Sequence, residues 1–376
     1  MKSILIQAAW FCILLASLVT GLHAAIFDVM KFGAKADGKT DDSKAFVGAW
    51  GAACKAAGAN TITAAGKYMA GPILFQGPCK GAITIEAHKM IMTALPDPYA
   101  FKGQPWVTFS RVNGLTINGG TFDGNGAAAW KLPECGKKGN VCRLPANLYF
   151  NVMTGLKIIG VTNKNSKQFH MTIGGCKDVT IQNYTVDTPG DAPNTDGVHI
   201  GKSSKVSIIG ASIKTDDDCV SLGDGVQDVH VEKVTCGPGH GLAIGSLGKY
   251  PNEKPVLGIT FKNCTLTGTT NGARIKTWPG SPVGSATNMH FEDIVMNNAA
   301  SKVKLSGIGF KNIKGTSSSK VAMTIHCSPA VPCQGVIMND INLVYKGKDG
   351  AAVSSCTNVK PSIAGKVVPA ACSTHK

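Results

Sequence analysis

The chain has 376 residues, and its 38 Lys and Arg against 23 Asp and Glu give a formal net charge of +15. A protein this basic is expected among polyanions, which leaves nucleic acid, an anionic membrane or an acidic polysaccharide as partner classes, with an unspecific basic surface as the alternative. We find no RNA-binding signature, zinc-finger spacing or compact Lys/Arg block, so the sequence argues against nucleic acid. The 45 Gly and 18 Pro, with few long helical runs, favour an all-β chain.

Residues 1–24 have the pattern of a secretory signal peptide. Lys2 forms a short positive region, an apolar stretch runs from Ile4 to Val19, and small residues surround Ala24 and Ala25. A spanning helix needs roughly 18 apolar residues, and no later run reaches that length. We therefore expect a secreted, extracellular protein without a membrane segment, with residues 25–376 forming a single domain.

A helix is predicted close to the start of this domain. Thr40 is expected to cap it, with Asp41 and Asp42 in the first turn, where carboxylates suit the positive end of the helix dipole. Helical spacing places one set of residues on a single face: Ala45, Phe46, Ala49, Trp50 and Ala53. We expect this helix to cover the open end of a stacked sheet, which would otherwise expose unpaired backbone.

From Trp106 onward, a triplet of alternating apolar residues recurs. Its copies begin at Leu115, Leu156, Val179, Val206, Val229, Ile259, Met289, Ile308 and Val336. Alternation with period two indicates strands, and the steps of 19 to 41 residues leave no room for strand–helix–strand units. The repeat predicts a parallel β-helix, in which the chain coils and each turn, or rung, pairs with the next.

Three segments interrupt the repeat. The 41-residue step contains Cys135 to Cys142 and reads as a surface loop, while the 19-residue step across Asn298 to Ser306 is too short for a full rung. The tail from Tyr345 is rich in Ala, Ser and Lys, and we expect an irregular wrap over the last rungs.

Twelve cysteines remain once Cys12 leaves with the signal peptide, an even number suited to an oxidising compartment. Close pairs are candidate disulfides, although the sequence leaves the connectivity open: Cys135/Cys142, Cys219/Cys236, Cys327/Cys333 and Cys356/Cys372. Cys176 and Cys264 fit equally well as buried free thiols. There is no Cys-x-x-Cys or close Cys/His cluster, so we expect no zinc.

Four polar clusters lie between Asn194 and Lys276. They are Asn194-Thr195-Asp196-Gly197, Asp216-Asp217-Asp218-Cys219, Gly239-His240-Gly241 and Arg274-Ile275-Lys276. Asp196 to Asp218 is 22 residues, and Asp218 to His240 is 22 again. Taken singly, an acid pair is usually solvated, Gly-His-Gly is usually a turn and Arg-x-Lys is usually surface. Their recurrence at rung spacing predicts one stacked site.

Parallel strands lie roughly 4.7–4.9 Å apart, which would bring the carboxylates of Asp196, Asp217 and Asp218 within a few ångströms. Neighbouring residues on a strand point to opposite sides, so gathering these groups requires a bend or bulge beside Gly197 or Asp218. Crowded acids repel, and at least one should have a raised pKa and keep its proton. A protonated acid beside ionised carboxylates is what glycoside hydrolysis needs.

His240 is expected one rung beyond Asp218, and Arg274 and Lys276 one rung further. Positions i and i+2 share one face of a strand, so Arg274 and Lys276 should form a cationic wall beside the acids. Arg can hold a carboxylate with two hydrogen bonds, and Lys adds a point charge. This arrangement suits an anionic sugar.

At these four motifs the sequence resembles the polygalacturonases of glycoside hydrolase family 28, most of all the exopolygalacturonases of plant pollen, a group that includes pollen allergens. The resemblance covers essentially the whole mature chain. It implies a right-handed parallel β-helix, acting in the cell wall on polygalacturonate (pectin) by hydrolysis of α-1,4 links with inversion. It further implies an exo-acting enzyme without metal or cofactor, and we expect a monomer with no nucleic-acid partner.

The resemblance also implies roles for single residues. Asp217 would be the general acid, Asp196 and Asp218 would position and activate the water, and His240 would assist Asp217. Asn194 would form part of the subsite before the cleaved bond, and Arg274 and Lys276 would bind substrate carboxylates.

The sequence departs from the family pattern at three places: Asp216 replaces the usual Gly, the aromatic residue that commonly follows the Arg-x-Lys rung has only His290-Phe291 as its nearest match, and a segment is missing near Asn298 to Ser306. Three alternatives therefore stay open, namely a rhamnogalacturonan or xylogalacturonan hydrolase, a calcium-dependent pectate lyase, and a catalytically weakened, basic wall-binding protein. Asn183 and Asn263 match the glycosylation pattern, and both fall within strand repeats.

Overall fold

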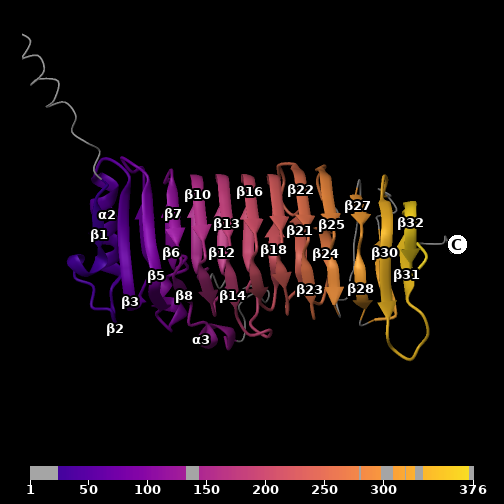
Figure 1. Cartoon of the computed structure of the whole chain (residues 1–376), viewed down its shortest axis with the longest axis horizontal. Helices are drawn as coiled ribbons and strands as arrows, with labels where there is room; N and C mark the ends of the chain where they lie inside the picture. Colours follow the sequence, from indigo (N-terminus) through magenta and orange to yellow (C-terminus); the bar gives the residue numbers. More distant parts are fainter. Residues whose placement is uncertain are drawn as a thin grey trace, which may run out of the picture.

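The computed structural model describes residues 24–132, 144–278, 281–297, 308–317, 319–326 and 333–371. These residues form a parallel β-helix, as the sequence predicts, and the strand pairings among them are parallel. Strands follow one another along a single long axis, so segments adjacent in sequence lie on neighbouring rungs (Figure 1). None of the described helices is both long and apolar enough to span a membrane. Residues 1–23, which make up all but the last residue of the predicted signal peptide, lie outside the described part.

The strands form three columns. The first column consists of β1 (Ile26–Asp28), β3 (Asn60–Ala70), β5 (Ile83–Ala94), β7 (Leu115–Asn118), β10 (Thr154–Ile159), β13 (Lys177–Gln182), β16 (Ser204–Ile209), β19 (Gln227–Glu232), β22 (Val256–Lys262), β25 (Ala286–Glu292), β27 (Ile308–Lys311), β30 (Ile337–Tyr345) and β32 (Ser362–Val368). The second consists of β2 (Asp37–Asp41), β8 (Thr121–Asp123), β11 (Thr162–Lys164), β14 (Thr185–Asp187), β17 (Ser212–Lys214), β20 (Thr235–Cys236), β23 (Thr265–Thr267), β26 (Val295–Asn297) and β28 (Lys314–Ser317). It joins the first column through the long strands β3, β5 and β30.

The third column is a separate sheet that carries the polar clusters. It consists of β4 (Ile73–Gln76), β6 (Val107–Ser110), β9 (Leu148–Asn151), β12 (Met171–Gly174), β15 (Val198–Gly201), β18 (Asp218–Leu222), β21 (Gly241–Leu247) and β24 (Ala273–Thr277). Two further strands, β29 (Val321–His326) and β31 (Val353–Thr357), pair with each other. The short helices are η1 (Val29–Phe32), η2 (Pro98–Phe101) and α3 (Ala127–Trp130), and the long helix is α2 (Ser43–Lys55).

The apolar triplets of the sequence are the register positions of the first column. Leu156 pairs with Val179, Val179 with Val206, and Val206 with Val229. The pairing continues through Ile259 to Met289. Each rung therefore places an apolar side chain over the one before, as the repeat predicts.

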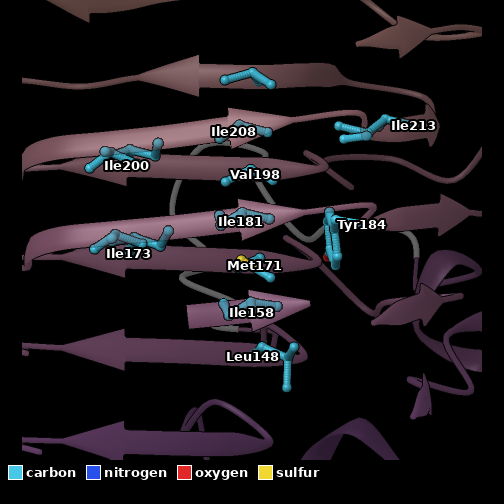
Figure 2. Close-up of a cluster of buried hydrophobic side chains, with 14 of the residues drawn as sticks. Leu148, Ile158, Met171, Ile173, Ile181, Tyr184, Val198, Ile200, Ile208 and Ile213 are labelled. Carbon is cyan, nitrogen blue, oxygen red and sulfur yellow. The ribbon is translucent and has the colours of Figure 1, made fainter. Parts of the chain in front are cut away.

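The core is the space enclosed by the columns. Figure 2 shows Ile173 and Ile200 of the third column pointing inward, with Ile181 and Ile208 of the first column on neighbouring rungs. These side chains are fully buried. Because successive residues of a strand point to opposite sides, burying these positions turns the residues between them, such as His199, away from the core.

Helix α2 buries the predicted face, including Phe46 and Trp50, and packs on β1, β3 and β4 at the N-terminal end of the stack (Figure 1). The expected cap is wrong. Thr40 lies in β2 and its hydroxyl donates to Asp37, while the helix begins at Ser43 with Asp42 as its N-cap. The Asp42 carboxylate instead accepts from two backbone amides of the preceding loop, so it ties that loop down.

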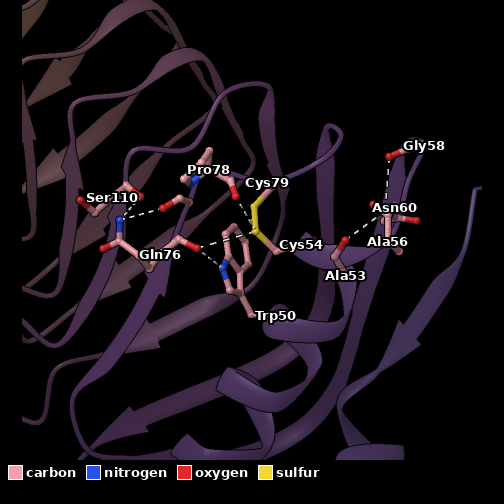
Figure 3. Close-up of a disulfide and its surroundings, with 11 residues drawn as sticks. Trp50, Ala53, Cys54, Ala56, Gly58, Asn60, Gln76, Pro78, Cys79 and Ser110 are labelled. Carbon is pink, nitrogen blue, oxygen red and sulfur yellow. Dashed lines mark hydrogen bonds between the residues drawn. A yellow bond between two sulfur atoms is a disulfide. The ribbon is translucent and has the colours of Figure 1, made fainter.

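Two disulfides are complete in the described part. Cys219–Cys236 is one of the four candidate pairs, whereas Cys54–Cys79 was not among them. Figure 3 shows Cys54–Cys79 beside the Trp50 indole, which donates to the Gln76 carbonyl and so joins α2 to the end of β4. A helix residue and a loop residue 25 positions apart give no local pairing signal.

The other cysteines divide into two groups. Cys176 and Cys264 are buried free thiols, one of the two alternatives left open. Cys333 and Cys356 are disulfide-bonded. The remaining proposed partners lie outside the described residues: Cys135, Cys142, Cys327 and Cys372.

Two other expectations are corrected. The tail is not irregular, since β31 pairs with β29 and β32 with β30. Asn183 and Asn263 lie in exposed turns with φ of 52° and 51°, between strands rather than within them. The proposed short rung, Asn298 to Ser306, lies outside the described residues.

Candidate active site

The four polar clusters occur at the starts of four consecutive strands of the third column: β15, β18, β21 and β24. Register pairs Val198 with Val220, Val220 with Leu242, and Leu242 with Ala273. The rung order predicted from the 22-residue spacing is therefore confirmed.

Asp218 is the most deeply enclosed acid of the site, with its side chain 2 % exposed. Its Oδ1 accepts from the Arg274 guanidinium at 2.6 Å, and its Oδ2 accepts from Lys276 Nζ at 2.7 Å. The register between β18 and β21 shifts between Asp218 and Val220, which is the expected irregularity beside Asp218. Two cations compensate the cost of burying this carboxylate.

The ion pairs span two rungs, from β24 to β18, and Ala243 of β21 is the residue between them. Ser221 pairs with Ala243, and Ala243 pairs with Arg274. Ala243, the β21 partner of Arg274, has only a methyl group, which leaves room for the Arg274 side chain to extend past β21 to Asp218. In the free protein, Arg274 and Lys276 thus bind the Asp218 carboxylate.

Asp217 faces the outside of the same bend. Its Oδ1 accepts from the Asp218 backbone amide at 2.7 Å and lies 2.9 Å from His240 Nδ1. Its side chain is 20 % exposed and that of His240 is 35 % exposed, so both are accessible to a ligand. The backbone amide of His240 also donates to the Asp217 carbonyl, which fixes the two residues together.

Asp196 lies on the rung before Asp218 and is buried. Burial, reinforced by the charges of Asp217 and Asp218, raises the pKa of Asp196 well above its ordinary value. At least one acid was expected to have a raised pKa, and Asp196 has one, with burial as the larger cause and crowding by the neighbouring carboxylates as the smaller. A hydrogen bond from Ser221 Oγ to Asp196 Oδ2, 2.6 Å long, acts in the opposite direction.

Asn194 and Asp216 lie at the edges of the site. Asn194 is exposed and has a left-handed backbone, with φ of 54°, in the turn that leads to Asp196. Asp216 has a raised pKa because of partial burial and the charges of Asp217 and Asp191, while His240 acts in the opposite direction. Asp216 thus belongs electrostatically to the acid cluster.

Two histidines of the site were not singled out from the sequence. His170 is fully buried, and its Nδ1 lies 3.0 Å and 3.2 Å from the carbonyl oxygens of Thr195 and Asp196, so it positions the Asp196 turn. His199 Nδ1 lies 2.7 Å from Ser221 Oγ. A signal was present, since His199 to Ser221 is again 22 residues, the interval that separates Asp196 from Asp218.

In the described part of the chain, one group of acidic and histidine side chains is close enough together to hold a metal ion. It consists of Asp217, Asp218 and His240, each with one possible ligand atom within 4.8 Å of those of the other two. Arg274 and Lys276 already balance the charge of Asp218. A divalent cation would have to displace them, so the donor set suits side-chain cations better than a metal.

Comparison with known proteins gives consistent results. The family described as glycosyl hydrolases family 28 matches residues 54–303 and 297–372. An exopolygalacturonase of Arabidopsis thaliana is 47 % identical over 370 residues, covering 93 % of this chain and 83 % of the relative. An exopolygalacturonase of Platanus acerifolia is 45 % identical over 368 residues, covering 92 % and 97 %.

Solved structures share the fold at low identity. The exopolygalacturonase of Thermotoga maritima has a TM-score of 0.70 at 19 % identity, covering 90 % of this chain and 91 % of its own. The endo-xylogalacturonan hydrolase of Aspergillus tubingensis has a TM-score of 0.75 at 23 % identity, covering 90 % and 100 %. Together with the matched motifs on consecutive rungs, the family match shows that this chain is a glycoside hydrolase and belongs to family 28.

Proposed function

We propose that this chain is a secreted cell-wall enzyme that hydrolyses α-1,4 links of polygalacturonate with inversion, releasing residues from the chain end. The observation that carries the proposal is the contact between a three-acid cluster and a cationic pair. Asp218 bonds Arg274 and Lys276 within one shared site, beside Asp196 and Asp217. Acids supply hydrolysis, and the cations match a substrate with one carboxylate per sugar.

The geometry supports Asp217 as the acid that protonates the leaving oxygen. The hydrogen bonds that fix it both reach Oδ1, so Oδ2 can face the substrate, and His240 is placed to exchange a proton with it. Asp196 and Asp218 would hold the attacking water. A substrate carboxylate entering the site would draw Arg274 and Lys276 from Asp218, which then becomes available to that water. Asn194 would contact the sugar before the cleaved bond.

Release of reducing sugar from purified polygalacturonate tests the activity. We expect turnover by the wild type and a loss of about a thousandfold or more in Asp217→Asn, because the amide cannot donate the proton. Asp187→Asn, an exposed acid on the second column, is the matched control and should keep full activity. No release by the wild type, or equal release by Asp217→Asn, contradicts the proposal. Activity that persists in chelator would separate hydrolysis from a calcium-dependent lyase.

The stereochemistry needs its own test. Oxygen atoms of Asp217 and Asp218 approach within 4.8 Å, closer than the roughly 6.5–9.5 Å usual for an inverting acid–base pair. Inversion is therefore proposed from family membership, not from this separation. Proton NMR of the first product should show the β-anomer before mutarotation, and an initial α-anomer would contradict inversion.

Exo action, the release of sugar from the chain end, is supported by the two plant relatives, which are described as exopolygalacturonases. Sizing of early products should give monomer alone, whereas a ladder of oligomers would mean internal cleavage. Parallel assays on rhamnogalacturonan and xylogalacturonan decide the substrate, and preference for either would replace polygalacturonate.

Two finer expectations remain proposals. We expect helix α2 to close the first rung, so Trp50→Ala should lower the free energy of unfolding by about 3–5 kcal/mol in denaturant titration. An unchanged midpoint would contradict this capping role.

Secretion predicts that protein collected from the medium of plant cells begins at Ala25, which N-terminal mass spectrometry would check.

A further inference from the structure

Asp196, Ser221 and His199 form a continuous chain of hydrogen bonds. Ser221 Oγ lies 2.6 Å from Asp196 Oδ2 and 2.7 Å from His199 Nδ1. His199 and Ser221 are register partners at the middle of β15 and β18, on the outward side of the third column. The His199 ring also packs on Phe169, with 5.2 Å between the ring centroids. Strand register and packing thus fix this hydrogen-bond chain in place.

The number of protons in this chain limits its states. A hydroxyl has one proton, so Ser221 cannot donate to both neighbours. When Asp196 is ionised, Ser221 donates to it and His199 must carry its proton on Nδ1 to complete the second bond. When Asp196 is protonated, the direction reverses: Asp196 donates to Ser221, Ser221 donates to Nδ1, and the His199 proton is on Nε2. The tautomer of His199 and the ionisation of Asp196 are therefore linked.

The surroundings of His199 favour its neutral form, in which the link to Asp196 operates through the His199 tautomer. Burial lowers the pKa of His199, and the charge of Lys276 adds to this, while the charges of Asp218 and Asp224 act in the opposite direction. Asp196 faces the negative charges of Asp217 and Asp218, and Lys276 only partly offsets them.

We propose that His199 and Ser221 are positioning residues that hold Asp196 ionised and aimed at the attacking water, through donation from His199 Nδ1 to Ser221 and from Ser221 to Asp196. This inference rests on the proposed hydrolysis. Asp196 is buried beside two other acids, and both its burial and their charges favour its protonated form. As the base it must lose that proton before it can activate water. The chain stabilises its carboxylate form.

The pH dependence of kcat/KM on polygalacturonate tests the proposed role of this hydrogen-bond chain. Ser221→Ala should move the acidic limb of the profile to higher pH and lower kcat about tenfold on that limb, with KM within about twofold of wild type. Ser207→Ala is the matched control. It removes a half-buried serine on β16 that also pairs in register with a histidine, His230, and it should leave the profile unchanged.

Two substitutions of His199 separate hydrogen bonding from packing. His199→Phe keeps a ring against Phe169 but has no N–H, so it should shift the profile in the same direction as Ser221→Ala. His199→Asn places an amide N–H where Nδ1–H was, and should restore the acidic limb. An unshifted limb in Ser221→Ala, or an Asn variant no better than the Phe variant, would overturn the proposal.

A measurement on the free protein separates this inference from the proposed function. Nitrogen-15 NMR of the imidazoles, with His199 assigned from His199→Asn, should show the Nδ1–H tautomer at the pH optimum and a change to Nε2–H as Asp196 is protonated. Finding the Nε2–H tautomer of His199 at every pH would overturn the proposed hydrogen-bond chain. Because this measurement needs no turnover, an inactive wild type showing the Nδ1–H tautomer would reject the proposed hydrolysis while leaving the hydrogen-bond chain in place.

Discussion

Asp196 and Asp218 are two buried carboxylates only one rung apart, and their partners make them different. Asp218 bonds two cationic side chains, whereas Asp196 bonds a neutral hydroxyl. A charge buried with cations is compensated, and a charge buried beside other acids is not. The site therefore contains one acid held by ion pairs and one whose ionisation costs stability.

This difference predicts a stability effect of Asp196→Asn. The pKa of Asp196 is raised in the folded state, so the wild type is most stable when this acid is protonated and loses stability as pH rises through the folded pKa. The neutral amide avoids that loss. We expect a melting temperature a few degrees above wild type at pH 7, and no difference near pH 3, below the ordinary value of 3.8.

Differential scanning calorimetry at both pH values measures this effect, with Asp187→Asn as a surface control. The same variant should lose hydrolytic activity, since the amide cannot act as a base. A melting temperature equal to or below wild type at pH 7 would contradict the assignment of the buried charge to Asp196.

At the scale of elements, the site depends on the bend that starts β18. Gathering Asp217 and Asp218 on one side requires the register shift after Asp218, and Cys219 follows directly. Its disulfide to Cys236 ties this bend to β20, 17 residues further along the chain. We therefore expect the disulfide to hold the two acids in place as well as to restrict the unfolded chain.

Removing this disulfide should affect both stability and activity. For a loop of this length, we expect the Cys219→Ala/Cys236→Ala variant to lose about 3 kcal/mol of unfolding free energy. We also expect kcat to fall about tenfold or more well below its melting temperature, because the acids shift. Denaturant titration and steady-state kinetics measure the two effects.

The second disulfide is the matched control. Cys54–Cys79 closes a loop of 25 residues at α2, away from the four site strands. Its double alanine variant should lose similar stability and keep kcat. If both variants lose activity equally, the Cys219–Cys236 bond has only a general stabilising role.

At the scale of the whole molecule, a net charge of +15 surrounds a site that itself concentrates acids. Long-range attraction toward a polyanion then comes from the rest of the surface, and the local acids act once the substrate is bound. We therefore expect salt to weaken substrate binding without changing the rate of the chemical step.

We expect KM for polygalacturonate to rise several-fold between about 0.01 M and 0.15 M salt, as the screening length falls from about 30 Å to about 8 Å, with kcat nearly constant. Digalacturonate is the matched substrate. Digalacturonate is too short to extend far beyond the active site, so it should show a weaker dependence. An equal dependence for both substrates would place the attraction within the site alone.

The sequence by itself determined the β-helix, because each apolar triplet must lie over the next one to be buried, as Val179 does over Leu156. It also determined the rung order of the acids, His240 and the cationic pair, since their spacing follows the same rung length. Sequence rules for helix capping were less reliable, because a side chain can form a different local hydrogen bond. Thr40 is the example: its hydroxyl donates to Asp37 instead of capping α2.

Only the tertiary structure decided which contacts these residues make. It showed that Arg274 and Lys276 reach past β21 to Asp218, that burial places the raised pKa on Asp196, and that Ser221 and His199 complete its hydrogen bonds. The physical reason is that rung spacing fixes which strand a residue occupies. Burial, reach across rungs and hydrogen-bond direction depend instead on three-dimensional neighbours that lie 20 to 60 residues away in sequence.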